Sequence, residues 1–329
     1  MEEGIARAHI NIALVKYWGK RDPSLNLPMN GSISVTLDHY SVTASVVVES
    51  CQQGDSLFVN GVPGSSQETQ RASEFFSRLR ATAGVSGGVT ACTTANMPMA
   101  AGLASSSAAF AALTKAFALS LRLPWSLPEL SRLARLGSGS ASRSIHGGFV
   151  EWLRGNREDG QDSYAVPLGT MDSWSSLAFV VVQVESGPKA VSSRDGMQRV
   201  VETSPLYQGW LASISEDLTR VRQAIHQRNL SQLGLVAESN ALKMHATGLA
   251  AVPPLLYWTG ATVSVIRRVQ ALREEGLKAY VTIDAGPHPV VLVESHQAAT
   301  VADLLSQIPG VTGVVITRPG PGVEAVSSI

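Results

Sequence analysis

The sequence predicts an α+β protein, because segments with strand periodicity and segments with helix periodicity follow one another irregularly. Two early strands are predicted at residues 5–18 and 32–49, the second from the alternation of apolar side chains between residues 42 and 48. A long helix is predicted at 206–225, where apolar residues recur at intervals of three and four. Because the elements show no regular βαβ order, an α+β fold is favoured over a doubly wound sheet.

The bulk composition narrows the class of protein. The chain has 329 residues and a formal net charge of zero, which fits one large domain or two ordinary ones and argues against nucleic acid as a main partner. Its apolar runs are too short to span a membrane, and its first four residues lack a signal region. Cys51 and Cys92 have no metal-ligand spacing. We therefore expect a cytoplasmic protein without a membrane partner.

The other elements are predicted from local patterns. Further helices are expected at 67–84, 103–121, 128–136, 230–247, 261–276 and 297–306, and further strands at 89–95, 148–153, 177–185, 279–283, 288–294 and 311–317. Ser126 is the expected N-cap of the third helix of the chain, and Pro205 is expected in the first turn of the long one. Composition changes at Ser186-Gly187-Pro188, which predicts domains at 1–186 and 187–329.

A glycine- and serine-rich turn at residues 97–107 is the first candidate site. It leads into the helix predicted at 103–121, whose first backbone N–H groups have no partner within the helix. Small side chains there admit an anion, and serine hydroxyls can add hydrogen bonds or reach a metal ion. An ordinary loop capped by serine fits these residues equally well. The turn is not a G-x-x-x-x-G-K-[ST] loop, because no lysine follows Gly102.

Three further segments carry charged groups that suit phosphate chemistry. Residues 11–21 place three cations beside Tyr17 and Trp18, although Lys16 and Asn11 fall on opposite faces of a regular strand. Residues 138–143 place an arginine after three serines in a glycine-interrupted loop. Residues 192–197 add a further arginine and hydroxyls. For each segment a solvated strand end, a plain connection or a helix cap is the competing interpretation.

Asp284 lies at the end of an apolar strand, before Gly286-Pro287. A carboxylate at a strand end can act as a base, although the same residue also fits an Asx-turn. Together the segments offer a phosphate cradle, cations for a second polyanion and one carboxylate. That combination fits phosphoryl transfer from ATP to a small phosphorylated acceptor.

The same segments, in the same order, resemble the mevalonate diphosphate decarboxylase family of the GHMP kinase superfamily. The resemblance extends over nearly the whole chain, and residues 16–20 and 137–143 are its most specific parts. The matching segments are Asn11–Ala13, Lys16–Asp22, Leu27–Pro28, Ser32–Leu37, Ala100–Ser106, Gly137–Ser140 with Arg143-Ser144, Gly147–Trp152, Glu202–Pro205, Met244–Thr247 and Asp284–Pro287. Three positions depart from the usual pattern, namely His9, Gly31 and His288.

The resemblance implies a two-domain fold and a reaction. Its first domain is expected to be similar to ribosomal protein S5 domain 2, and its second to be a ferredoxin-like α+β unit, with the active site between them. The implied reaction uses MgATP to phosphorylate the 3-hydroxyl of mevalonate 5-diphosphate, and loss of phosphate and CO₂ then yields isopentenyl diphosphate. The family also implies a homodimer.

The resemblance also implies a role for each matching residue. Asp284 is expected to deprotonate the 3-hydroxyl, Lys16 and Arg143 to complete an Asp–Lys–Arg group, and Ser140 to lie beside the transferring phosphate. Arg143 and Asn11 are expected to hold the substrate carboxylate. The substrate diphosphate and its surroundings are assigned to Tyr17, Trp18, Gly19, Lys20, Arg71, Ser138, Gly139, Ala141, Ser142, Ser193 and Arg194. The ATP phosphates are assigned to Ala101, Gly102, Leu103, Ser105, Ser106 and Ser107, with Ser106 also assigned to Mg²⁺.

Two classes of alternative remain at this point. A sister decarboxylase that uses mevalonate 5-phosphate, or a mevalonate 3-kinase, has nearly the same site, although the presence of Lys16, Arg143 and Asp284 disfavours the kinase. A non-catalytic nucleotide sensor on the same fold is disfavoured by Asp284.

Overall fold

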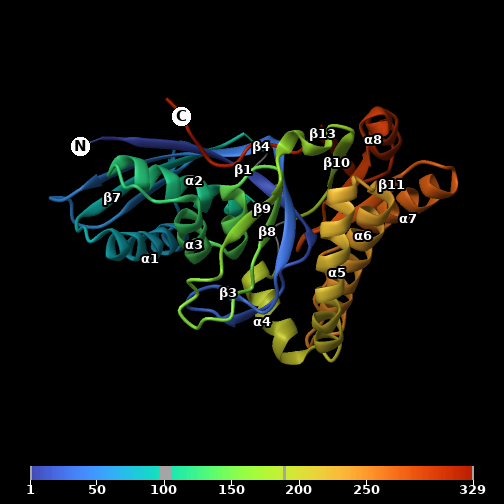
Figure 1. Cartoon of the computed structure of the whole chain (residues 1–329), viewed down its shortest axis with the longest axis horizontal. Coiled ribbons are helices and arrows are strands. Elements are labelled where there is room, and N and C mark those ends of the chain that lie inside the picture. Colours follow the sequence, from blue (N-terminus) through green and yellow to red (C-terminus); the bar gives the residue numbers. More distant parts are fainter. Residues whose placement is uncertain (1, 97–104, 188–189, 328–329) are drawn as a thin grey trace.

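The computed structural model describes residues 2–96, 105–187 and 190–327, and these form two lobes that each contain a β-sheet (Figure 1). The first lobe contains β1 (Gly4–Val15), β2 (Lys20–Asp22), β3 (Leu27–Pro28), β4 (Ser32–Glu49), β5 (Ser56–Val59), β6 (Val62–Pro63), α1 (Ser66–Ala83), β7 (Gly88–Ala95), α2 (Ser105–Ser120), α3 (Leu127–Gly137), the 3₁₀ helix η1 (Gly139–Ile145), β8 (Phe149–Trp152) and β9 (Ala165–Gly169).

The second lobe is richer in helices. It contains the 3₁₀ helix η2 (Met171–Trp174), β10 (Leu177–Val184), α4 (Ser193–Thr203), α5 (Tyr207–Gln227), α6 (Leu230–Leu249), α7 (Gly260–Glu274), β11 (Ala279–Ile283), β12 (Pro289–Glu294), η3 (Ser295–Gln297), α8 (Ala298–Ser306) and β13 (Val311–Thr317). The chain then returns to the first lobe, where β14 (Glu324–Ala325) pairs with β1. No described helix combines the length and apolar character that a membrane span requires.

The first sheet is built on β4. Residues 33–36 and 41–46 of β4 pair antiparallel with β1, while its first residues pair with β8 and its last with β7. Helix α2 packs against both β1 and β4. The register between β1 and β4 shifts between His9 and Asn11 and again between Ala13 and Val15. The side chains of the last residues of β1 therefore do not alternate regularly between the two faces of the sheet. This irregular end of β1 lies against α6 of the second lobe.

The second sheet has the order β11-β12-β10-β13, and helices cover both of its faces. On β10, Phe179 and Val181 belong to the core shared with α5 and α6, whereas Val180 and Val182 pack with α7 and α8. This two-sided burial explains why residues 177–182 form an unbroken apolar run. Because β10 pairs with β12 and β13, we propose a domain division before Leu177, earlier than the one placed at residues 186–187.

Most of the predicted elements are present with similar ends, and Ser126 caps α3 as expected. Two expectations were wrong. The first strand ends at Val15 instead of residue 18, because the chain leaves the sheet at Lys16. Pro205 lies outside α5, whose N-cap is Leu206. In addition, the short strands β2, β3, β5, β6, β9 and β14 were not predicted. Segments this short carry little periodicity, and β8 and β11 are apolar throughout or nearly so, which made them easier to predict.

Helix α6 approaches β11 closely because Gly234 faces the ring of Tyr280. A Cβ atom at Gly234 would lie 2.1 Å from Cγ of Tyr280, which is far inside van der Waals contact. Gly209 in α5 is the opposite case, since nothing lies within 4 Å of its added Cβ. Alanine substitutions at these two glycines therefore separate the effect of helix propensity on stability from the effect of packing.

Gly234→Ala is expected to lower the free energy of unfolding by about 2 kcal/mol, because overpacking outweighs the roughly 1 kcal/mol that alanine contributes to a helix. Gly209→Ala is the control and should leave stability unchanged or raise it slightly. Urea denaturation of both variants checks this. A Gly234→Ala protein as stable as the parent would contradict the close packing of α6 on β11.

Candidate active site

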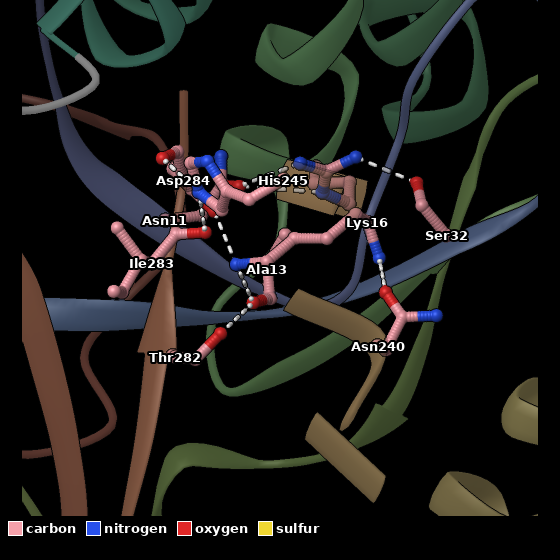
Figure 2. A network of polar contacts seen from close by, with 10 residues as sticks. Asn11, Ala13, Lys16, Ser32, Asn240, His245, Thr282, Ile283 and Asp284 are labelled. Carbon is pink, nitrogen blue, oxygen red and sulfur yellow. Dashed lines mark hydrogen bonds and ion pairs between the residues drawn. The ribbon is translucent and has the colours of Figure 1, made fainter. Parts of the chain in front are cut away.

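An ion pair joins the ends of two strands that belong to different sheets. Lys16 follows β1, and its Nζ donates to the Ala13 carbonyl at 2.7 Å and to Asp284 Oδ1 at 2.6 Å. Asp284 directly follows β11 (Figure 2). The Asx-turn interpretation of Asp284 was wrong, because the hydrogen bond of its carboxylate goes to Lys16.

The two members of this pair differ in exposure. The Lys16 side chain is 2% exposed, whereas that of Asp284 is 34% exposed. Burial lowers the pKa of Lys16, Asp284 opposes the shift, and the nearby charge of Arg143 adds to it. A reactant can therefore approach the exposed side of the carboxylate, while the ammonium group contacts the carboxylate from its buried side.

Arg143 is held beside this pair by Asn11 and Ser32. Its Nε and Nη2 donate to Asn11 Oδ1 at 3.2 and 3.1 Å, and its Nη1 donates to Ser32 Oγ at 2.7 Å. Burial lowers the pKa of Arg143 to about 10, with Asp284 opposing the shift, so the guanidinium stays charged at neutral pH. Three of its five N–H groups are used in these bonds, and the others remain for a ligand.

The side-chain amide of Asn11 orients Arg143. Its Nδ2 donates to the Ser140 carbonyl at 3.1 Å and to Ser144 Oγ at 2.8 Å, while its Oδ1 accepts from Arg143. Both amide hydrogens and the oxygen are therefore bonded to protein groups. A direct contact of Asn11 with the substrate carboxylate stays a prediction.

The segment after Lys16 brings an unusual hydroxyl and several cations together. Tyr17 is buried, and among the described residues its hydroxyl has no hydrogen-bond partner. Burial raises the pKa of Tyr17, with the charges of Arg143 and Arg194 opposing the shift. Burial lowers the pKa of Lys20 to about 8, and the positive charges of Arg194 and Arg71 add to the shift. Such a cluster of cations beside a neutral hydroxyl suits a polyanion.

Trp18 and Gly19 serve this segment by packing. The Trp18 carbonyl accepts from the Tyr207 hydroxyl at 2.9 Å, and its side chain is 2% exposed. Gly19 has φ +99°, and an added Cβ would lie 2.1 Å from the same hydroxyl. Both residues therefore shape the turn between Tyr17 and Lys20, and their contact with substrate stays a prediction.

The loop at 138–143 forms the 3₁₀ helix η1 instead of an open connection. Ser138 Oγ and Ser140 Oγ lie 3.4 Å apart, and both side chains are partly exposed. Gly139 packs against Tyr17 and Trp152, where an added Cβ would lie 2.8 Å from the tyrosine ring. Ala141 and Ser142 are fully buried, and the Ser142 hydroxyl donates to the Gly139 carbonyl at 2.8 Å. Both residues therefore stabilise the turn, and their contact with substrate stays a prediction.

Arg71 lies on α1, and Ser193 and Arg194 lie on α4. Arg71 on α1 donates to the Gly137 carbonyl at 2.9 Å and lies over the Phe110 ring. Ser193 and Arg194 form the first turn of α4, whose N-cap Ser192 accepts from the Asp195 backbone N–H. The helix-cap interpretation of Ser192 is thus confirmed, and it leaves Arg194 exposed near Lys20 and Arg71.

The chain is similar in sequence and fold to members of one family. Models described as the diphosphomevalonate decarboxylase-like N-terminal domain and the mevalonate 5-diphosphate decarboxylase C-terminal domain match residues 8–165 and 178–316. The chain belongs to the diphosphomevalonate decarboxylase family. The resemblance found in the sequence is confirmed.

Individual relatives match over nearly their whole length. Diphosphomevalonate decarboxylase of Candida albicans is 35% identical over 97% of this chain and 97% of its own. The Staphylococcus aureus mevalonate diphosphate decarboxylase structure matches with a TM-score of 0.94 and 40% identity, over 99% of this chain and 98% of its own. A structure described as "MDDEF in complex with MVAPP, AMPPCP and Magnesium" matches with TM-score 0.94 and 39% identity over 99% of both chains. The two-domain α+β fold is thereby confirmed.

The phosphate turn of this decarboxylase is described in part. Ala101, Gly102 and Leu103 lie outside the described residues. Ser105 and Ser106 are exposed at the start of α2, and Ser107 is buried. The first turn of α2 contains no acidic residue, so its N-terminus suits an anion. The described residues include no group of three His, Cys, Asp or Glu side chains suited to a metal, and Mg²⁺ commonly takes its ligands from phosphates and water instead.

Sequence reasoning missed two residues around the ion pair of the decarboxylase, Asn240 and His245. Asn240 Oδ1 accepts from the Lys16 backbone N–H at 2.8 Å, and His245 Nε2 lies 3.1 Å from the Asp284 carbonyl (Figure 2). Residues 244–247 belong to a matching segment of the family, but their spacing carries no sign of these contacts. A contact between residues 224 positions apart, such as Lys16 and Asn240, has no periodic signal.

His245 is expected to make stability depend on pH. Burial, with the charge of Lys16 adding to it, lowers the pKa of His245 to about 4. Since the pKa in the unfolded chain is about 6.5, the neutral buried form contributes stability above that pH and loses it as pH falls toward 4. Between pH 7 and pH 5 this group is expected to cost the folded state about 2 kcal/mol.

His245→Gln should remove that dependence, because glutamine does not titrate. Urea unfolding at pH 7 and pH 5 then compares the two proteins. The parent is expected to lose about 2 kcal/mol more than the variant over this interval. An equal loss in both proteins would show that His245 is not buried in its neutral form.

Proposed function

We propose that this chain catalyses the ATP-dependent decarboxylation of mevalonate 5-diphosphate to isopentenyl diphosphate, with release of ADP, phosphate and CO₂. The observation that most directly supports this proposal is the Lys16–Asp284 ion pair, in which a partly exposed carboxylate contacts a buried ammonium group. Family membership supplies the reaction, and the isoprenoid precursor it forms places the enzyme in the mevalonate pathway. The pair supplies a base at the junction of the two lobes.

The first step that we assign is phosphorylation of the tertiary alcohol. Asp284 takes the proton of the 3-hydroxyl, and the oxygen forms a bond to the γ-phosphorus of ATP as the bond to the ADP oxygen breaks. Lys16 holds the carboxylate in place through the hydrogen bond from its Nζ to Asp284 Oδ1. Ser105, Ser106, Ser107 and Ser140 are the proposed phosphate ligands, with Ser106 also on Mg²⁺. The bound metal ion would supply charge stabilisation on the transferring phosphoryl group.

The second step is elimination. The C3–O bond breaks and its electron pair leaves with phosphate, while the bond between the carboxylate carbon and C2 breaks and its electrons form the C2–C3 double bond. Arg143 orients the carboxylate that leaves as CO₂, and Asn11 and Ser32 fix the guanidinium in turn. No proton from the protein is needed in this step.

The diphosphate is proposed to bind beside Tyr17. Lys20, Arg71 and Arg194 are close enough that the charges of both arginines lower the pKa of Lys20. Ser138 and Ser193 are further proposed ligands of the diphosphate, and Ser193 directly precedes Arg194 on α4. Three cations exceed the need of a single phosphate, which favours mevalonate 5-diphosphate over the monophosphate. A cytoplasmic homodimer, as the family resemblance implies, is part of the same proposal, and light scattering tests the dimer.

Assays with mevalonate 5-diphosphate and mevalonate 5-phosphate in parallel, following ADP and CO₂, test the proposal. The diphosphate should release both products in equal amounts. Release of ADP without CO₂ would indicate a 3-kinase. A preference for the monophosphate would indicate a sister decarboxylase, and release of neither product would indicate a nucleotide sensor.

Asp284→Asn is expected to lower kcat about 1,000-fold per folded site, since a general base contributes a rate factor of that order. The unfolding midpoint is measured alongside, because Lys16 loses its partner.

Tyr17→Phe tests the diphosphate site. Because the Tyr17 hydroxyl is buried without a partner among the described residues, its removal should leave stability unchanged or raise it by up to about 1 kcal/mol. The Kd for mevalonate 5-diphosphate should rise about tenfold, since a hydrogen bond to a charged group is lost. Tyr207→Phe is the control: its hydroxyl is bonded to Trp18, so it should lose about 1 kcal/mol of stability. Unchanged affinity in Tyr17→Phe would remove Tyr17 from the site.

A further inference from the structure

Two buried polar side chains of α6 touch the backbone on either side of the ion pair, and the proposed reaction uses neither of them. Asn240 is 0% exposed and His245 is 6% exposed. They lie five residues apart on one rigid helix, which corresponds to about 7.5 Å along its axis. Their hydrogen bonds lead to Lys16 and to Asp284 respectively.

The orientation of the Asn240 side-chain amide is fixed by a carboxylate of the neighbouring helix α5. Its Nδ2 donates to Asp217 Oδ2 on α5 at 2.8 Å, and Lys243 Nζ donates to the same oxygen at 2.7 Å. An ionised carboxylate only accepts hydrogen bonds, so the Asn240 NH₂ group must face Asp217. The Asn240 oxygen is thereby turned toward the Lys16 backbone N–H, where it accepts at 2.8 Å. The Lys16 carbonyl is held independently by Asn30 Nδ2 at 2.8 Å.

The tautomer of His245 is fixed in the same way. Its Nε2 lies 3.1 Å from the Asp284 carbonyl and 3.3 Å from the Ile283 carbonyl, and carbonyl oxygens only accept. Nε2 therefore carries the hydrogen. The ring packs against Trp258, with centroids 4.8 Å apart, which restricts its rotation. A neutral donor at this place holds the end of β11 without adding a charge beside Lys16.

We propose that α6 is the positioning element of the catalytic pair, with Asn240 fixing the backbone at Lys16 and His245 fixing the backbone at Asp284. The inference rests on the proposed function. The strands β1 and β11 belong to different sheets, and the Thr282 hydroxyl, 3.1 Å from the Ala13 carbonyl, is a direct link between them. One helix that grips both strand ends keeps the ammonium and carboxylate in register (Figure 2). A misplacement of about 1 Å at such a pair costs on the order of 100-fold in rate.

The kinetic test uses three variants. Asn240→Leu and His245→Leu remove the two hydrogen bonds, and leucine has the same branching as asparagine. His245→Gln restores a donor near the position of Nε2. kcat is expressed per site titrated by calorimetry with mevalonate 5-diphosphate. Both leucine variants should lose about 100-fold in kcat while Kd stays within threefold, and His245→Gln should recover to within about fivefold of the parent.

A matched control separates positioning from general destabilisation. Glu151, whose side chain is buried, forms an ion pair at 2.6 Å with the partly exposed Arg222 of α5, and among the described residues the hydrogen bonds of this pair do not involve Lys16 or Asp284. Glu151→Gln should lower stability and leave kcat per titrated site within threefold of the parent. The proposal is overturned if the leucine variants keep kcat per site within threefold of the parent, or if His245→Gln is as impaired as His245→Leu.

Hydrogen exchange provides a readout that needs no activity. The Lys16 amide donates to Asn240, and the Gly286 amide donates to the Asp284 carbonyl. Asn240→Leu should accelerate exchange at least tenfold in the peptide containing Lys16, and His245→Leu should do so in the peptide containing Gly286, while β13 stays protected. Uniform acceleration, or none, would overturn the positioning role. An inactive parent with the expected exchange pattern would instead contradict the proposed substrate and leave the role of α6 standing.

Discussion

The site depends on one interaction, the ion pair between Lys16 and Asp284. A buried ammonium group without a partner costs several kcal/mol, so the fold must bring a carboxylate to the end of β1. Asp284 meets that requirement from the other lobe, and its partial exposure is compatible with the role of base that we propose for it. The same contact therefore joins the two sheets and is the point at which we propose that the alcohol of the substrate binds. Structural and chemical constraints coincide at this pair.

Further cations surround the ion pair in two groups. Arg143 lies on one side, held by Asn11 and Ser32, and a second cluster of Lys20, Arg71 and Arg194 lies near Tyr17. Burial lowers the pKa of Lys16, Lys20 and Arg143, which means that each charge is kept at an energetic cost. A polyanionic substrate relieves that cost when it binds. His245, by contrast, contributes a hydrogen bond while staying neutral.

The elements around the site are held by packing that tolerates little change. Gly234 lets α6 lie against Tyr280 on β11, and Gly19 lets the turn after Lys16 lie against Tyr207. Because α6 contacts β1 as well as β11, a small shift of this helix would be felt at both ends of the ion pair. The packing of one helix thus links the core of the second lobe to the geometry at the junction.

The sequence by itself determined the α+β class, most helices and strands, the family, and the candidate reactive residues, such as Lys16, Arg143 and Asp284. These follow from periodicity, turn residues and local motifs, which are written in neighbouring positions. Only the tertiary structure decided that Asn11 serves Arg143, that Ala141 and Ser142 are buried, and that Asn240 and His245 reach the pair. Those relations join residues far apart in the chain, and a register shift at the end of β1 helps to set them. Neither has a local signal, because both arise from how the sheets and α6 pack together.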